Sequence, residues 1–163
     1  LVYGNPKRDR YLMHRKEAGK GRERKLLATE AAQDKTPLRG WYLESNDLLL
    51  FTLTKNYFNA VSGILWQTDQ RSYIRKTVGI QALFDILRLI CPEAIAAKDV
   101  SEQFFARRLA PCKSINFTND FFQASGTGRL RIRNALELEL GLKTLAEMNE
   151  TDRPTYERIS GLK

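Results

Sequence analysis

The chain has 163 residues, of which 42% are hydrophobic, enough for one folded domain with an apolar core. Lysine and arginine outnumber aspartate and glutamate by 27 to 19, so the formal net charge is +8 at pH 7. This excess of positive charge favours polyanionic partners, with nucleic acid ranked ahead of an anionic membrane surface. The alternative is that the charge only keeps the protein soluble. No apolar run approaches the roughly 20 residues of a membrane helix. The polar, basic start is unlike a signal peptide, and we expect a cytoplasmic protein.

Residues 1–40 are predicted to form a basic N-terminal arm. Eleven basic residues stand against five acidic ones before residue 40, and they supply most of the net charge. The Gly19-Lys20-Gly21 step interrupts any long helix, so we expect an arm without regular structure. A short helix from about Glu23 to Gln33 and a turn at Thr36-Pro37 would follow it. Such a charge run is either a solvated face or an arm that orders on nucleic acid.

A helical core domain is predicted for residues 41–142. It opens with a short strand or entry segment at Trp41–Leu43. Helical periodicity then predicts a helix over residues 48–66 and a buried central helix over 77–90, which Pro92 should end.

Two shorter helices complete the predicted core. The first spans residues 102–109 with Asp99 or Ser101 as its cap, and the second spans 127–140 with Thr127 as its cap and Gly141 as its stop. Residues 143–163 are polar and are predicted to be a loosely held C-terminal tail, with or without one helical turn. The predicted fold class is therefore mainly α, a single helical globular domain with at most short strands.

The most distinctive stretch of the chain is a glycine-containing loop followed by alternating arginines. Glycines let a backbone approach a ligand closely, a helix N-terminus attracts anions, and arginine suits phosphate. Arginines near a helix start also oppose the helix dipole, unless an anion or an acidic partner compensates. The alternative is a helix start with ordinary surface arginines. The candidate nucleic-acid-binding residues here are Gly126, Gly128, Arg129, Arg131 and Arg133.

A second basic cluster, Arg71, Arg75 and Lys76, precedes the central helix. Tyr73 lies among these cations, where an exposed aromatic ring could stack on a base. The alternative is that Tyr73 covers the core, as buried tyrosines commonly do.

The sequence has few of the residue types that catalytic sites commonly use. Cys91, Cys112 and His14 are the only cysteines and histidine, too few for a four-ligand zinc site, and His14 lies in the arm. We expect reduced, partly buried thiols, with a disulfide as the alternative. The pair Glu137 and Glu139 is expected on a solvated acidic face, and no P-loop is present. The sequence predicts no catalytic residue, no metal and no cofactor.

Several segments taken together resemble a known family. They are Asn56-Tyr57-Phe58-Asn59-Ala60, then Trp66, then Arg75-Lys76-Thr77-Val78-Gly79-Ile80-Gln81-Ala82-Leu83, and then Phe121-Phe122-Gln123-Ala124-Ser125-Gly126-Thr127-Gly128-Arg129. Over residues 41–141 the chain resembles the C-terminal part of DGQHR-domain proteins. Those proteins are similar to regulators in bacterial DNA phosphorothioation and in related DNA-modification or phage-defence islands. The Asp-Gly-Gln-His-Arg motif itself does not occur in this sequence.

The resemblance implies the helical C-terminal portion of a larger α/β protein in a DNA-associated context. We therefore expect a DNA-binding or DNA-modification-associated module without catalysis of its own. Two alternatives stay open. One is a protein-interaction domain of a bacterial defence or modification complex. The other is a fragment of an enzyme whose active site lies in a preceding region.

Overall fold

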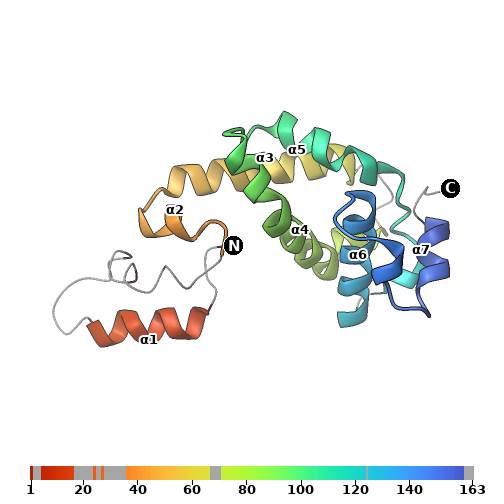
Figure 1. The fold of residues 1–163 in the computed structure, drawn as a ribbon, viewed down its shortest axis with the longest axis horizontal. Helices are drawn as coiled ribbons and strands as arrows, with labels where there is room; N and C mark the ends of the chain where they lie inside the picture. The colour runs from red at the N-terminus through yellow and green to blue at the C-terminus, as the bar shows by residue number, and fades with distance from the viewer. Residues whose placement is uncertain are drawn as a thin grey trace. The chain divides into compact units, whose positions relative to one another are not determined.

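The computed structural model describes residues 1, 5–16, 24, 27, 36–66, 71–123 and 125–159 (Figure 1). Every regular element in these ranges is a helix, which confirms the mainly α fold class. The chain divides into two compact units, Leu1–Lys55 and Asn56–Lys163. The boundary falls within helix α3 (Asp47–Ile64).

The first unit contains α1 (Pro6–Lys16) and α2 (Arg39–Leu43). An arm without regular structure was predicted where α1 forms. The helix starts there because Pro6 suits a first helical position and the Asn5 side chain accepts a hydrogen bond from the Arg8 backbone N–H at 3.0 Å. The helix predicted over residues 23–33 lies outside the described residues, except for positions 24 and 27.

Of the two alternatives given for Trp41–Leu43, the short strand is wrong, because these residues belong to α2. The Tyr42 N–H donates to the Leu38 carbonyl at 3.1 Å, a helical hydrogen bond. Tyr42 and Leu43 join Leu27 in a small apolar cluster, against which Leu50 packs.

The second unit contains residues 56–64 of α3 and the helices that position most of the predicted site. They are α4 (Thr77–Ala96), α5 (Glu102–Leu109), α6 (Gly126–Glu139) and α7 (Arg153–Ile159). Short 3₁₀ turns connect them, namely η2 (Tyr73–Arg75), η3 (Ala110–Ser114), η4 (Asp120–Phe122) and η5 (Leu145–Glu147).

Helix α4 is the centre of this unit, and α6 packs against it (Figure 1). The prediction of a central buried helix beginning at Thr77 is confirmed, but Pro92 does not end it. A proline at this position leaves the carbonyl of Arg88 without its helical N–H donor. The Cys91 thiol faces that same carbonyl, with sulfur and oxygen 3.8 Å apart, and the helix continues to Ala96.

The ends of α5 and α6 follow the predicted pattern closely. Helix α5 has the predicted bounds, and the Ser101 side chain accepts from the Phe104 N–H as its N-cap. The N-cap of α6 is Ser125 rather than the predicted Thr127. Gly141 has φ = +66°, a left-handed conformation that favours glycine after a helix.

The stretch after Gly141 is folded as far as Ile159, so the prediction of a loosely held tail is wrong over these residues. Tyr156 of α7 is 1% exposed and Met148 is 4% exposed. The side-chain amide of Asn134 donates to the Tyr156 hydroxyl at 3.3 Å and ties α7 to α6. The apolar positions are few, but Met148 and Tyr156 among them are buried.

Candidate nucleic-acid interface

The glycine loop is shaped by contacts within the chain. The Ser125 hydroxyl accepts from the Gly128 N–H at 3.1 Å and so caps α6. A Cβ atom at Gly128 would stand 1.7 Å from the Gln123 carbonyl oxygen, so only glycine fits this close approach. A Cβ at Gly126 would meet no atom within 4 Å. Gly128 therefore serves packing of the loop against α6, whereas Gly126 lies on the surface.

Arg129 is held by a carboxylate on α4. Its Nε donates to Oδ2 of Asp85 at 2.9 Å, and its Nη2 donates to Oδ1 at 2.7 Å. The pair is bidentate, the arrangement that fixes a guanidinium group most firmly. Its geometry ties the start of α6 to the middle of α4.

Arg131 is held by the turn that precedes α7. It donates to both carboxylate oxygens of Asp152, at 3.1 and 2.8 Å, and to the Phe121 carbonyl at 3.2 Å. Its guanidinium carbon also lies 4.3 Å from the centre of the Phe121 ring. The Arg131 guanidinium group therefore uses most of its hydrogen-bonding capacity within the chain, and one of its faces is covered by an aromatic ring.

Arg133 bonds to Glu137 one helical turn further along α6, with Nε and Oε1 2.7 Å apart. The prediction of a solvated acidic face is wrong for Glu137, because only 4% of this residue is exposed. The Lys143 ammonium lies 3.9 Å from its other oxygen and donates to the Asn134 side chain at 3.0 Å. A buried carboxylate needs such partners, and two cations supply them here.

The three predicted arginines thus contact three different elements. Asp85 belongs to α4, Asp152 to the turn before α7, and Glu137 to α6 itself. Each of the three guanidinium groups therefore pairs with a different carboxylate of the chain.

The second predicted cluster stands just before α4, and all three of its cations are exposed. The Lys76 ammonium lies 4.4 Å from the centre of the Tyr73 ring. The Tyr73 hydroxyl donates to Asp120 at 3.3 Å, and Arg75 makes a long contact of 3.5 Å to the Trp66 carbonyl. Tyr73 is half-buried, with one cation over its ring. Arg71, Arg75 and Lys76 therefore form an exposed basic corner.

A third basic surface, on α1, was not singled out from the sequence as a site. Lys7, Arg8 and Arg10 are exposed, and Tyr11 beside them is 61% exposed. The only acidic residue of α1 is Asp9, which is turned inward and 7% exposed.

Asp9 accepts two hydrogen bonds from Arg39, at 2.5 and 2.8 Å, and Arg39 is itself 5% exposed. The negative charge of α1 is therefore neutralised inside the first unit. The positive charges of its first turns stay at the surface. The sequence signal was present, since α1 has five cations in 11 residues, but the inward turn of Asp9 could not be seen from it.

Comparison with known proteins identifies no relative of this chain: no family model, curated protein or solved structure matches it. Among the described residues, no three histidine, cysteine, aspartate or glutamate side chains gather in a way that could hold a metal ion. None of the described helices is both long and apolar enough to cross a membrane.

Proposed function

We propose that this chain is a nucleic-acid-binding module whose preferred ligand is DNA. In this proposal α1 supplies the main phosphate contacts. The observation that carries the proposal is the separation of charge on α1. Its cations Lys7, Arg8 and Arg10 are exposed, while Asp9 is buried against Arg39. A helix that presents cations and withdraws its only acid suits a phosphate backbone.

Tyr11 adds a reason to favour nucleic acid over other polyanions. It follows Lys7 by four residues and Arg8 by three, so the three side chains lie on neighbouring positions of one helix surface. A tyrosine that is 61% exposed beside cations can stack on an unpaired base. This arrangement predicts a preference for single strands that charge alone would not give.

The basic corner formed by Arg71, Arg75 and Lys76 is a second phosphate contact in this proposal. Arg129, Arg131 and Arg133 act instead as ties within the fold, because each already has a carboxylate partner. Phosphate contacts position a protein without reading sequence, so we expect weak sequence preference. The resemblance to DGQHR-domain proteins suggests a bacterial, cytoplasmic context of DNA modification or defence.

The proposal is tested by fluorescence anisotropy with short single- and double-stranded DNA over a salt series. We expect log Kd to rise steeply with log salt. The variant Lys7→Gln/Arg8→Gln/Arg10→Gln should bind more weakly, and the slope should shrink by about 0.7–0.9 for each phosphate that the variant no longer neutralises. Tyr11→Ala should weaken binding of single strands more than of duplex.

The matched control removes the same charge elsewhere, as Lys55→Gln/Arg88→Gln/Arg107→Gln, three residues that are exposed in the structure. It should change the salt slope much less than the α1 variant does. Absence of binding at low salt, or equal weakening in both triple variants, contradicts the proposal.

A further inference from the structure

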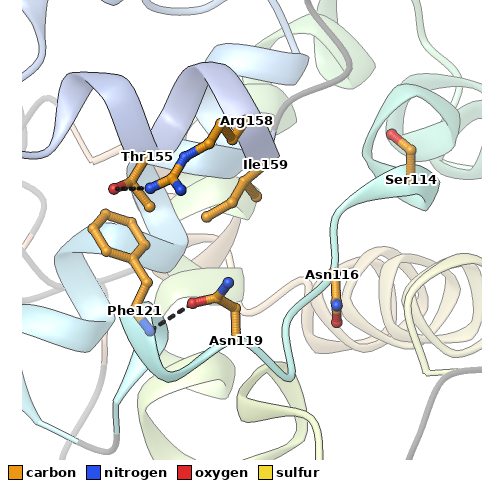
Figure 2. Close-up of a pocket in the computed structure, with 7 residues that line it drawn as sticks. All are labelled: Ser114, Asn116, Asn119, Phe121, Thr155, Arg158 and Ile159. Carbon is orange, nitrogen blue, oxygen red and sulfur yellow. Dashed lines mark hydrogen bonds between the residues drawn. The ribbon is translucent and has the colours of Figure 1, made fainter.

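A polar pocket lies between α7 and the segment 114–121 (Figure 2). Its volume is about 460 Å³, within the range of small-molecule sites. Helix α7 contributes three of the lining residues and the facing segment contributes four. They are Thr155, Arg158 and Ile159, and Ser114, Asn116, Asn119 and Phe121. Among the lining residues that the structure describes, Arg158 is the one that carries a charge.

The two asparagines of the lining use their oxygens to hold the loop. Oδ1 of Asn116 accepts from the Thr118 N–H at 3.1 Å and from the Thr118 hydroxyl at 2.7 Å. Oδ1 of Asn119 accepts from the Phe121 N–H at 2.9 Å (Figure 2). Because a backbone N–H can only donate, the atom that faces it must be the amide oxygen. The orientation of both amide groups is therefore fixed, with each NH₂ group on the other side.

These NH₂ groups make no hydrogen bond within the described part of the chain, and each can donate twice. The hydroxyl of Thr155 accepts from Nη2 of Arg158 at 3.4 Å (Figure 2). Nε of Arg158 donates to the Pro154 carbonyl at 3.3 Å, which leaves Nη1 to donate elsewhere. Donors within the chain thus occupy the side-chain oxygens of Asn116, Asn119 and Thr155. The Ser114 hydroxyl can donate as well as accept, and the two NH₂ groups and the charge of Arg158 remain.

We propose that this pocket binds a small phosphate monoester, with Arg158 and the amide groups of Asn116 and Asn119 donating to the phosphate oxygens. Donors without competing acceptors favour an oxyanion over a cation or a neutral polar ligand, and a guanidinium group is suited to phosphate. The volume exceeds that of a phosphate ion, and Phe121 and Ile159 offer apolar contact to the rest of the ligand. This site is independent of the surface proposed on α1.

The test is calorimetric titration of the whole chain with inorganic phosphate and with a nucleoside 5′-monophosphate, at constant ionic strength in chloride. We expect saturable binding of both, with the monoester binding more tightly. Asn119→Asp keeps the oxygen that accepts from the Phe121 N–H, and it replaces the donor by a negative charge. It should weaken binding at least about tenfold, the equivalent of 1.4 kcal/mol.

Asn149→Asp is the matched control. Oδ1 of Asn149 accepts from the Thr151 N–H at 3.0 Å in the same kind of turn, and Asn149 does not line the pocket. This variant should bind phosphate as the parent chain does. Equal weakening of binding in the two variants overturns the proposal, as does the absence of saturable binding by both probes.

Two further measurements separate this site from the surface on α1. The triple variant of Lys7, Arg8 and Arg10 should bind the nucleoside monophosphate unchanged, and weaker binding there overturns the pocket assignment. If Asn119→Asp weakens DNA binding while neither small probe binds, the pocket contacts the polymer, and the proposal of a small ligand is wrong. Unchanged DNA binding by Asn119→Asp, together with its weakened phosphate binding, supports it.

Discussion

Arg129 and Asp85 are 44 residues apart in sequence, and their side chains form a bidentate ion pair between the two helices at the centre of the second unit. An arginine so near a helix N-terminus opposes the helix dipole. The Asp85 carboxylate is the compensating anion, and it comes from the chain itself. The pair is partly exposed, with 44% of the Arg129 side chain and 23% of the Asp85 side chain accessible.

The first prediction concerns the strength of this pair. Because both groups retain some contact with water, we expect Asp85→Asn to lower the free energy of unfolding by only about 1 kcal/mol. A double-mutant cycle with Arg129→Gln should give a coupling free energy of about 0.5–1 kcal/mol, measured by urea denaturation. A coupling near zero would show that the geometry contributes nothing to stability.

The second prediction compares two glycines of the same loop. Gly128→Ala should lower the free energy of unfolding by about 1–3 kcal/mol or more. The new Cβ would overlap the Gln123 carbonyl oxygen unless the backbone moved. Gly126→Ala, where a Cβ meets nothing within 4 Å, should be neutral or stabilise by up to about 1 kcal/mol. Urea denaturation of both variants measures the difference, and similar effects would contradict the packing role of Gly128.

The sequence was informative where local rules decide the structure. Helix α5 has its predicted bounds, and α3, α4 and α6 start within one residue of their predicted starts. The errors have local causes as well. Ser125 rather than Thr127 caps α6, and the Cys91 thiol faces the carbonyl that Pro92 leaves without a helical donor.

The candidate site could be predicted less well, because the partners of a side chain depend on tertiary structure. Even the Arg133–Glu137 pair was not predicted, although its spacing of four residues is one that favours ion pairs on a helix. The partners of Arg129 and Arg131 are distant along the chain. The inward turn of Asp9 likewise depends on Arg39, 30 residues away. The number of charged residues can be counted from the sequence. Which of them remain exposed depends on the tertiary structure and could not be predicted.

The third prediction concerns the buried ion pair of the first unit. Asp9→Asn should lower stability by about 3–5 kcal/mol, because it removes the charged carboxylate that accepts two hydrogen bonds from the buried Arg39 guanidinium. The control is Asp47→Asn. Asp47 pairs with Arg24 at the surface, where 64% of its side chain is accessible, so the cost should stay below about 1 kcal/mol.

Both variants are compared with the parent chain by urea denaturation at pH 7, with hydrogen exchange to localise the destabilisation to residues of α1 and α2. Equal, small effects would show that the Asp9–Arg39 pair does not hold α1 in place. The proposed DNA contacts on α1 would then lack their fixed orientation.

The fourth prediction is a loss of stability at alkaline pH. Cys91 and Cys112 are both buried and free. Burial raises the pKa of the Cys91 thiol from 9.0 to about 11 and that of the Cys112 thiol to about 12, with Glu139 adding to the second shift. As pH rises, the unfolded chain releases these protons before the folded chain does. The stabilisation is therefore complete below about pH 8 and is lost as pH rises from about 9 towards 11 and beyond.

Urea denaturation at several pH values between 7 and 10.5 measures this decline. The variant Cys91→Ala/Cys112→Ala should start from lower stability, because it removes two buried side chains, but its stability should fall less between pH 8.5 and 10. Burial also raises the pKa of Tyr156 to about 12, which adds a decline that begins near pH 10, but Tyr156 is present in both proteins and so does not affect the comparison. An equal decline in the two proteins would mean that the thiols ionise as readily in the folded chain as in the unfolded one, which their burial in α4 and η3 opposes.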